Sequence, residues 1–296
     1  MTVKLLCYRY YALIKFNQSS STLNSKKEEA YVQSLTPDEN TTTTEESFTQ
    51  AQTPVKYNLP VSVNLRQQLN VKKSKNENVT ITNCIKTGNT LVFTDYFNNR
   101  LSICNSDGTD IYHIPLSYTP YYMTLVNSNT VAVSCGYDST ILIINISTGS
   151  VTSTINTSGI CWGISYNDNN LYVVIGGNGI TDITVDRERL VCIDYTSIYC
   201  CSLDGKLIWM FKQDKFQDLC SVTTDNEGTV YLTSERTRNV VVVSEDGKLY
   251  RELPTESDGL IKPWGIYFDT NDKILLVCND DDAFLFDVKQ NENKHE

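Results

Sequence analysis

The chain has 296 residues, of which 40% are hydrophobic, and a formal net charge of −10. This length suits one large domain or two ordinary ones. The longest apolar runs, residues 141–146 and 239–244, are strand-sized and far shorter than the roughly 20 residues of a transmembrane helix, so we expect no membrane association.

The N-terminal region, residues 1–56, is predicted to be mostly disordered. Lys4, Arg9 and Lys15 interrupt its apolar start, which we therefore do not interpret as a signal peptide. Residues 17–55 are rich in Ser, Thr, Glu and Gln and have few large apolar side chains, so burial cannot offset the entropy lost on ordering. Ten scattered cysteines without a C-x-x-C pair indicate buried free thiols in a reducing, cytoplasmic compartment.

Residues 57–289 are predicted to form one all-β domain, followed by a short tail over 290–296. Strand-turn-strand units recur along the domain, and their turn positions are Asp107, Thr148, Asp204, Asp246 and Asp287. The outer hairpins contain Asp-Gly or Thr-Gly, which suit turns that need a positive φ. Each hairpin follows another strand pair, so one unit has four antiparallel strands, as in a propeller blade.

The steps between these turns are 41, 56, 42 and 41 residues. A blade takes about 40 to 45 residues, so one interval is irregular. The strands expected there lie near 162–166, 171–175, 180–185, 189–194 and 197–202, and a further strand follows at 206–211. These are too many for one blade and too few for two. We therefore predict either six blades with compressed or incomplete third and fourth blades, or five blades plus an extra hairpin.

The last unit ends after three strands, at Val288. A propeller with an open edge strand would be prone to aggregation. The segment 61–71, which precedes the first full blade, is predicted to supply the missing strand and so to close the ring.

The stretches "DGKLIWMFK", "EGTVYLTSERTRNVVVVSEDGKLYREL", "DGLIKPWGIYFD" and "KILLVCNDDDAFLFDV" resemble NHL-repeat six-bladed propellers of the tripartite-motif family, particularly molluscan and other invertebrate members. The resemblance covers about residues 80–288. It implies a propeller that recognises the substrates of a ubiquitin ligase. The family's RING, B-boxes and coiled coil are not visible in this sequence, and the family pattern would place about 25 more residues between Gly179 and Tyr199.

Enzymatic chemistry is not predicted, and neither is a cofactor or a metal. Some six-bladed propellers are calcium-dependent hydrolases, which remain an alternative, but "CNDDDA" (278–283) is better explained as a solvated loop tip. His113 is expected in an outer strand far from the central channel and His295 in the tail, which argues against a histidine-based triad or dyad. The recurring "WGI" context of Trp162 and Trp264 predicts that these residues, together with Trp209, pack between blades.

A single-stranded RNA-binding propeller is a second alternative, because Arg side chains accompany aromatic ones in several loops. Residues 80–289 contain 14 Lys and Arg and 26 Asp and Glu, a net charge of −12 that opposes phosphate binding. We therefore predict a non-enzymatic platform that binds a protein or peptide through loops on one face. These loops are residues 96–99, 136–139, 176–179, 235–238 and 280–282. The predicted contact residues are Tyr96, Asn98, Arg100, Tyr137, Asp138, Asn178, Arg236, Arg238, Asp281 and Asp282.

Overall fold

A computed structural model of the chain describes residues 11–15, 54–57, 59–72, 77–176, 179–253, 257 and 259–290. Residues 17–55, which are predicted to be disordered, and the tail 290–296 lie almost wholly outside the described residues. Two short strands lie within the N-terminal region, β1 (Tyr11–Lys15) and β2 (Val55–Lys56). The described residues contain no helix that is long and apolar enough to cross a membrane.

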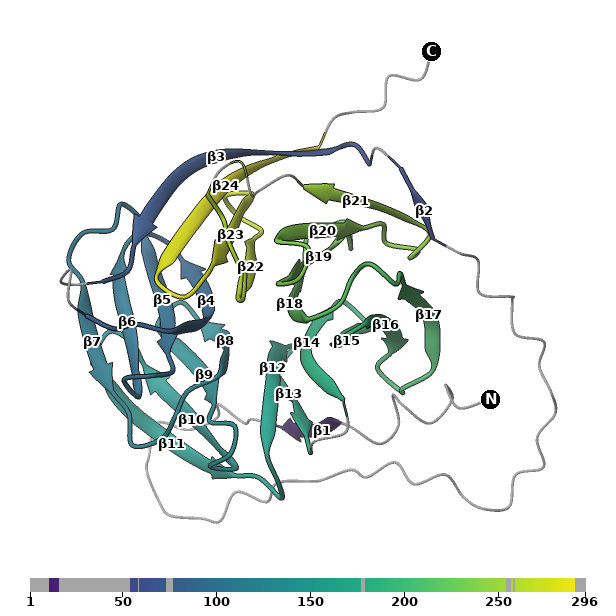
Figure 1. Ribbon diagram of the computed structural model, residues 1–296. Coiled ribbons are helices and arrows are strands. Elements are labelled where there is room, and N and C mark those ends of the chain that lie inside the picture. Colours follow the sequence, from purple (N-terminus) through teal and green to yellow (C-terminus); the bar gives the residue numbers. More distant parts are fainter. Residues whose placement is uncertain are drawn as a thin grey trace, which may run out of the picture.

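The protein is an all-β propeller with five complete blades, arranged in a ring (Figure 1). Blade 1 consists of β4 (Ile81–Thr87), β5 (Thr90–Asp95), β6 (Arg100–Asn105) and β7 (Tyr112–Pro115). Blade 2 consists of β8 (Tyr122–Asn127), β9 (Thr130–Ser134), β10 (Thr140–Asn145) and β11 (Ser150–Asn156). Blade 3 consists of β14 (Ile180–Asp186), β15 (Arg189–Asp194), β16 (Ser197–Ser202) and β17 (Leu207–Lys212).

The two remaining blades each include a strand that precedes blade 1 in the sequence. Blade 4 consists of β18 (Leu219–Thr224), β19 (Val230–Ser234), β20 (Asn239–Val243) and β21 (Leu249–Leu253), with β2 parallel to β21. Blade 5 consists of β22 (Ile266–Asp269), β23 (Ile274–Cys278), β24 (Asp282–Gln290) and β3 (Val61–Asn70). β3 pairs antiparallel with β24, as Figure 1 shows, so the predicted closing strand is confirmed.

The irregular interval contains an extra hairpin between blades 2 and 3. Its strands are β12 (Cys161–Asn167) and β13 (Asn170–Ile175), and β1 pairs with β13 to make a sheet of three strands. The alternative of five blades plus a hairpin is therefore the correct one. The Asp204 turn joins β16 to β17, so "SLDGKLIWMF" is the outer hairpin of blade 3.

The hydrophobic core is divided among the interfaces between neighbouring sheets. Leu171 and Val173 of β13 pack towards blade 2, whereas Tyr172 and Val174 pack towards blade 3. Alternating side chains of one strand thus fill two interfaces, as expected for a sheet that is buried on both faces. Every cysteine that the structure describes is a buried thiol outside any disulfide, as predicted.

Candidate functional site

The two faces of the ring differ in how the chain crosses them. The loops between the second and third strands of each blade lie on one face, together with the connections between consecutive blades. We call it the loop face. Backbone hydrogen bonds join the two sets of segments, for example from Leu116 N to Asn99 O (2.8 Å) and from Glu235 N to Asp218 O (3.0 Å). The tight turns form the opposite face, the turn face, where Ser106 N donates to Asn89 O (2.9 Å).

Four aromatic side chains meet on the loop face, and we call them the aromatic cluster: Tyr96, Tyr121, Tyr137 and Trp162. The ring centroid of Tyr121 lies 5.0 Å from that of Tyr96, 6.1 Å from that of Tyr137 and 5.1 Å from that of Trp162. Tyr137 and Trp162 are 5.3 Å apart. All four contacts are edge-to-face, the geometry that the charge distribution of aromatic rings favours.

The cluster is open to solvent on its outer side. The Tyr137 side chain is 69% exposed and that of Tyr96 is 36% exposed. Phe97, in the same loop as Tyr96, and Tyr195, between β15 and β16, are also exposed. Apolar rings gathered in this way on a surface are typical of a binding site.

Tyr121 is the fixed member of the cluster. Its N–H donates to Ser134 O (2.9 Å), and its carbonyl oxygen accepts hydrogen bonds from Thr82 Oγ1 (2.8 Å) and Thr94 Oγ1 (3.2 Å). Blades 1 and 2 thus hold this residue from both sides. A ring fixed before binding loses little conformational entropy when a partner arrives.

Gly136 makes room for the Tyr121 ring. A Cβ atom at this position would lie 2.5 Å from Cδ2 of Tyr121, too close for any real contact. Gly136 also has a φ of +26°, which is unfavourable for residues with a side chain. The Gly-Tyr-Asp order of residues 136–138 therefore serves the packing of the cluster.

The electrostatic environment of the cluster is acidic. Asp138 follows Tyr137 directly and accepts a hydrogen bond from Thr119 N (3.0 Å). Burial raises the pKa of Tyr121, and the Tyr96 hydroxyl and the charge of Asp138 raise it further. A carboxylate beside exposed ring faces favours a cationic group, because ring faces also carry negative potential.

The channel beneath the cluster is bridged by side chains. Tyr122 Oη donates to Cys220 O (2.9 Å), so blade 2 is tied to blade 4. Asp182 of β14 accepts hydrogen bonds from Ser221 Oγ (2.7 Å) and Val222 N (3.0 Å) of β18. Burial raises the pKa of Asp182 to about 7, although its hydrogen bonds act in the opposite direction.

The predicted contact residues fall into separate groups. Tyr96, Tyr137 and Asp138 come together around Tyr121. Arg100 and Asn98 instead bind Asp95, and Arg100 also pairs with Glu77 at 2.5 Å. Their side chains hold blade 1 together.

Four of the other predicted residues lie elsewhere on the loop face. Arg236 and Arg238 are exposed in the loop of blade 4. Asp281 pairs with Lys72, and Asp282 accepts a hydrogen bond from Asn70 Nδ2 (2.9 Å). The loop 176–179 joins β13 to β14, so it does not connect the second and third strands of a blade, and Asn178 lies outside the described residues.

Sequence reasoning missed Tyr121 and Trp162 as site residues. Trp162, Trp209 and Trp264 are all partly buried. Trp162 and Trp209 pack against cores between neighbouring sheets, as predicted. Trp162 packs on the core and also contacts the rings of Tyr121 and Tyr137 in the aromatic cluster. Its repeat context signalled the packing, whereas nothing local signalled the convergence with Tyr121.

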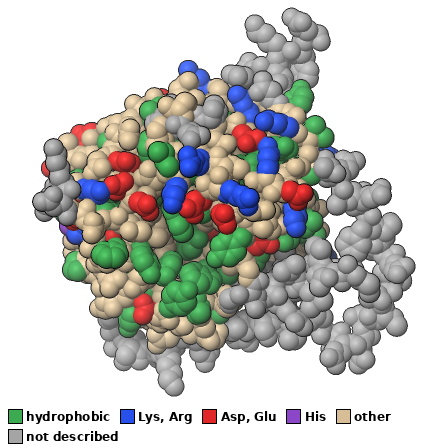
Figure 2. All heavy atoms as spheres, in the orientation of Figure 1, with side chains coloured by type: hydrophobic (Ala, Val, Ile, Leu, Met, Phe, Trp, Pro, Cys, Tyr) green, Lys and Arg blue, Asp and Glu red, His purple; other side chains and the backbone are tan. Residues whose placement is uncertain are grey.

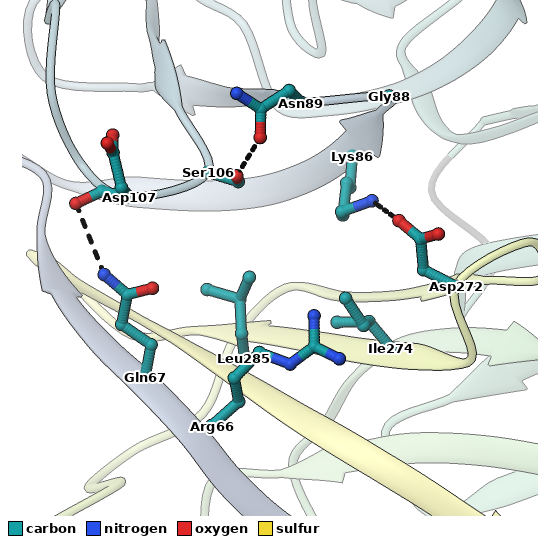
Figure 3. Close-up of a pocket in the computed structure, with 10 residues that line it drawn as sticks. All are labelled: Arg66, Gln67, Lys86, Gly88, Asn89, Ser106, Asp107, Asp272, Ile274 and Leu285. Atoms are coloured by element: carbon teal, nitrogen blue, oxygen red, sulfur yellow. Dashed lines mark hydrogen bonds and ion pairs between the residues drawn. The ribbon is translucent and has the colours of Figure 1, made fainter.

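A pocket of about 360 Å³ lies between blades 1 and 5, near the turn face (Figure 3). Its polar groups are already paired with one another. Lys86 Nζ lies 2.5 Å from Asp269 Oδ2 and also pairs with Asp272, and Gln67 Nε2 donates to Asp107 O at 3.3 Å. Burial lowers the pKa of Lys86, but the two carboxylates outweigh it and the pKa is raised. This pocket is the weaker candidate.

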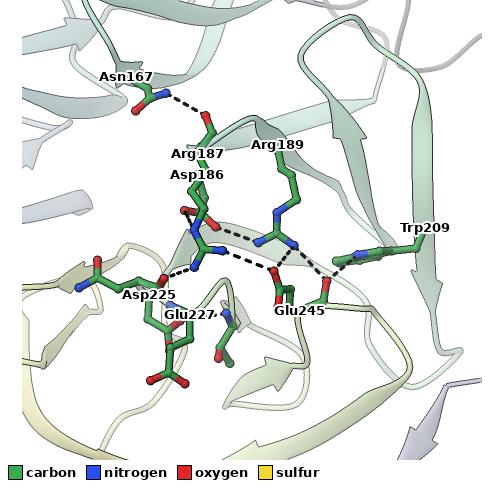
Figure 4. Close-up of polar contacts among 10 residues, drawn as sticks. Asn167, Asp186, Arg187, Arg189, Trp209, Asp225, Glu227 and Glu245 are labelled. Atoms are coloured by element: carbon green, nitrogen blue, oxygen red, sulfur yellow. Dashed lines mark hydrogen bonds and ion pairs between the residues drawn. The ribbon is translucent and has the colours of Figure 1, made fainter.

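Charged side chains on the turn face also bind one another (Figure 4). Arg189 pairs with Asp186 at 2.8 Å and with Glu245 at 3.5 Å, and Trp209 Nε1 donates to Glu245 O at 2.8 Å. Figure 2 shows that charges of both signs alternate over one part of the face in view, while hydrophobic side chains gather over the region of β12 and β13. The turn-face network is explained by packing between blades.

Catalytic groups do not stand out among the described residues. These residues contain no group of three or more His, Cys, Asp or Glu side chains placed to hold a metal ion. His113 lies in the outer strand β7, as predicted, and contacts Ser102 Oγ at 3.2 Å. Burial raises the pKa of Cys104 to about 11 and that of Cys220 to about 12, so these thiols stay protonated at neutral pH.

Comparisons with known proteins identify the fold. No family model and no curated protein matches the chain. A Bacteroides thetaiotaomicron protein of unknown function is similar in structure, with a TM-score of 0.60 and 12% identity over 77% of this chain and 76% of that one.

Two enzymes have similar structures. Virginiamycin B lyase from Staphylococcus aureus has a TM-score of 0.55 and 14% identity, over 77% of this chain and 99% of the lyase. Glutaminyl cyclase from Myxococcus xanthus has a TM-score of 0.52 and 9% identity, over 80% and 98% of the two chains. At these identities the similarity establishes the β-propeller fold and leaves the activity open.

Proposed function

We propose that this protein is a non-enzymatic interaction module, an NHL-type propeller that recognises an extended protein segment through its loop face. The observation that carries the proposal is the exposed aromatic cluster, fixed in place by Tyr121 and Gly136. Aromatic side chains are enriched among the residues that dominate binding energies at interfaces. A rigid ring of blades that presents them in loops is a common design for recognition.

The partner segment is expected to carry Lys or Arg. Asp138 lies beside the cluster, and residues 80–289 of the propeller have a net charge of −12 from 14 basic and 26 acidic residues. Cations bind over exposed ring faces with about 0.5 to 2 kcal/mol. Charge of opposite sign also speeds the encounter with the partner.

In tripartite-motif ubiquitin ligases, a propeller of this type recognises the substrate. The same role is consistent with the aromatic cluster of this chain. The printed sequence shows no RING pattern, so a separate module would transfer ubiquitin. Ligase recruitment is therefore a second step of the proposal, and binding of the basic segment is the first.

Selection from a random 16-residue peptide library tests the binding step. Wild-type protein should enrich extended peptides with Lys or Arg. Tyr137→Ala should weaken binding of an enriched peptide about tenfold, the size expected for an interface hot spot. Tyr112→Ala is the matched control, because Tyr112 is 44% exposed on the outer strand β7, away from the cluster, and it should leave binding unchanged.

Three outcomes would overturn the proposal. One is equal loss of binding in both variants, or no enrichment at all. Another is tight binding of a single-stranded RNA 20-mer at low salt that Tyr137→Ala abolishes, which would establish the RNA alternative. The third is thermal stabilisation by calcium together with ester or lactone hydrolysis, which would establish the hydrolase alternative.

A further inference from the structure

The hairpin β12–β13 is the incomplete part of the ring. The five complete blades have at least four strands each, whereas this sheet has two strands from its own region. No third strand follows β13 in sequence, because the chain continues directly to β14, the innermost strand of blade 3. The outer edge of β13 therefore needs a strand from elsewhere.

β13 has an apolar edge that is suited to strand addition. It reads Asn170-Leu-Tyr-Val-Val-Ile175 and contains no charged residue. Its side chains from Leu171 to Val174 are buried between the neighbouring sheets, which fixes their register. An uncovered strand of this kind recruits another strand through its free N–H and C=O groups.

β1 covers this edge within the same chain. It pairs antiparallel with β13, with Tyr11 opposite Val174 and Lys15 opposite Asn170. Figure 1 shows β1 beside β13, with blade 3 between this sheet and the blade that β2 joins. Thus a five-residue segment from the N-terminal region takes the place of a third strand.

The long connection between β1 and β2 does not restrict β1 to the β13 edge of its own chain. Residues 16–54 separate β1 from β2, and a chain of this length can span up to about 130 Å when extended. No tight turn ties β1 to β13, unlike the consecutive strands within each blade. The same five residues of another molecule can therefore reach the same edge in the same register.

We propose that the outer edge of β13 is a strand-acceptor site and that β1 of a second copy fills it. Reciprocal exchange gives a two-fold dimer in which each chain donates one strand and accepts one. The strand of the same chain competes with that of a second copy through its effective concentration at the edge, so exchange requires a high protein concentration. This site is independent of the loop face and its partner.

Disulfide trapping tests the proposal in the full chain, in a Cys7→Ser background. One variant carries Lys15→Cys and a second carries Asn170→Cys, the pair opposite each other in the register. A double variant with both changes reports pairing within one chain. The matched control for Asn170→Cys is Thr130→Cys, at the first residue of β9, whose edge is already covered by β10.

The double variant should form the 15–170 disulfide as a monomer in dilute solution. When the two single variants are mixed and concentrated, or refolded together, a disulfide-linked dimer should form at about ten times the yield of the Lys15→Cys and Thr130→Cys mixture. Linkage within the double variant without any dimer above the control would overturn the exchange. If neither the 15–170 disulfide of the double variant nor the linked dimer forms, the outer edge of β13 is not a strand-acceptor site.

Discussion

At the residue scale, buried groups near the channel hold the loop face in position. Tyr121 is bonded to both neighbouring blades, Tyr122 crosses to blade 4, and Asp182 ties β14 to β18. Single substitutions at these positions should therefore have distinct effects on peptide affinity and on the unfolding free energy.

Gly136→Ala should weaken binding of an enriched peptide about tenfold, because the new Cβ would displace the Tyr121 ring. Gly88→Ala is the control. Gly88 also has a positive φ (+54°), but nothing lies within 4 Å of its Cβ position. Both variants should lose about 1 kcal/mol of unfolding free energy from backbone strain, and Gly136→Ala alone should lose affinity. Equal affinity of the two variants would contradict the role of Gly136.

Asp182→Asn should change the pH dependence of stability. Burial raises the pKa of Asp182 to about 7 in the folded protein from its ordinary value of 3.8. The folded state therefore holds this proton more tightly than the unfolded state does. The contribution of protonated Asp182 to the unfolding free energy is greatest below pH 4 and is lost as the pH rises to about 7. The unfolding free energy of the variant, relative to wild type, should rise by up to about 1.4 kcal/mol per pH unit in this window. Parallel curves from urea titrations at each pH would disprove the assignment.

At the element scale, the strand β3 closes the ring, and its two faces differ. Leu69 is 7% exposed and packs into the interface between blades 5 and 1, whereas Leu65 is 38% exposed. Leu69→Ala should lower the unfolding free energy by about 2 to 4 kcal/mol, the usual effect of a cavity in a core. Leu65→Ala should cost less than about 1 kcal/mol. Similar losses in urea unfolding would mean that β3 does not pack as described.

Most elements could be predicted from the sequence. The turns at Asp204 and Asp246 and the apolar runs beside them locate the outer hairpins, since Gly and Asp suit such turns. The irregular step of 56 residues corresponds to the inserted hairpin over 161–175. The open edge after Val288 led directly to the closing strand.

Contacts between distant segments could not be predicted in the same way. β1 pairs with a strand more than 150 residues away, and no turn signal or repeat connects them. The aromatic cluster depends on Tyr121 and Trp162, which lie at the entrances of two different sheets. Sequence periodicity locates strands, but it does not show which loop residues converge when the ring closes.

At the scale of the whole molecule, the ring separates two faces with different properties. The charged groups of the turn face are paired with one another, whereas the loop face leaves Tyr137 and Tyr96 exposed beside an acidic group. The fold therefore supports a directional platform, and the loop face is the one we expect a partner to use.

Hydrogen–deuterium exchange of the full chain, with and without an enriched basic peptide, tests this claim most directly. Protection should appear in residues 96–100, 119–121 and 136–139, and the turns at 88–89, 106–108 and 226–228 should exchange as before. Protection confined to those turns, or spread evenly over both faces, would contradict recognition through the loop face.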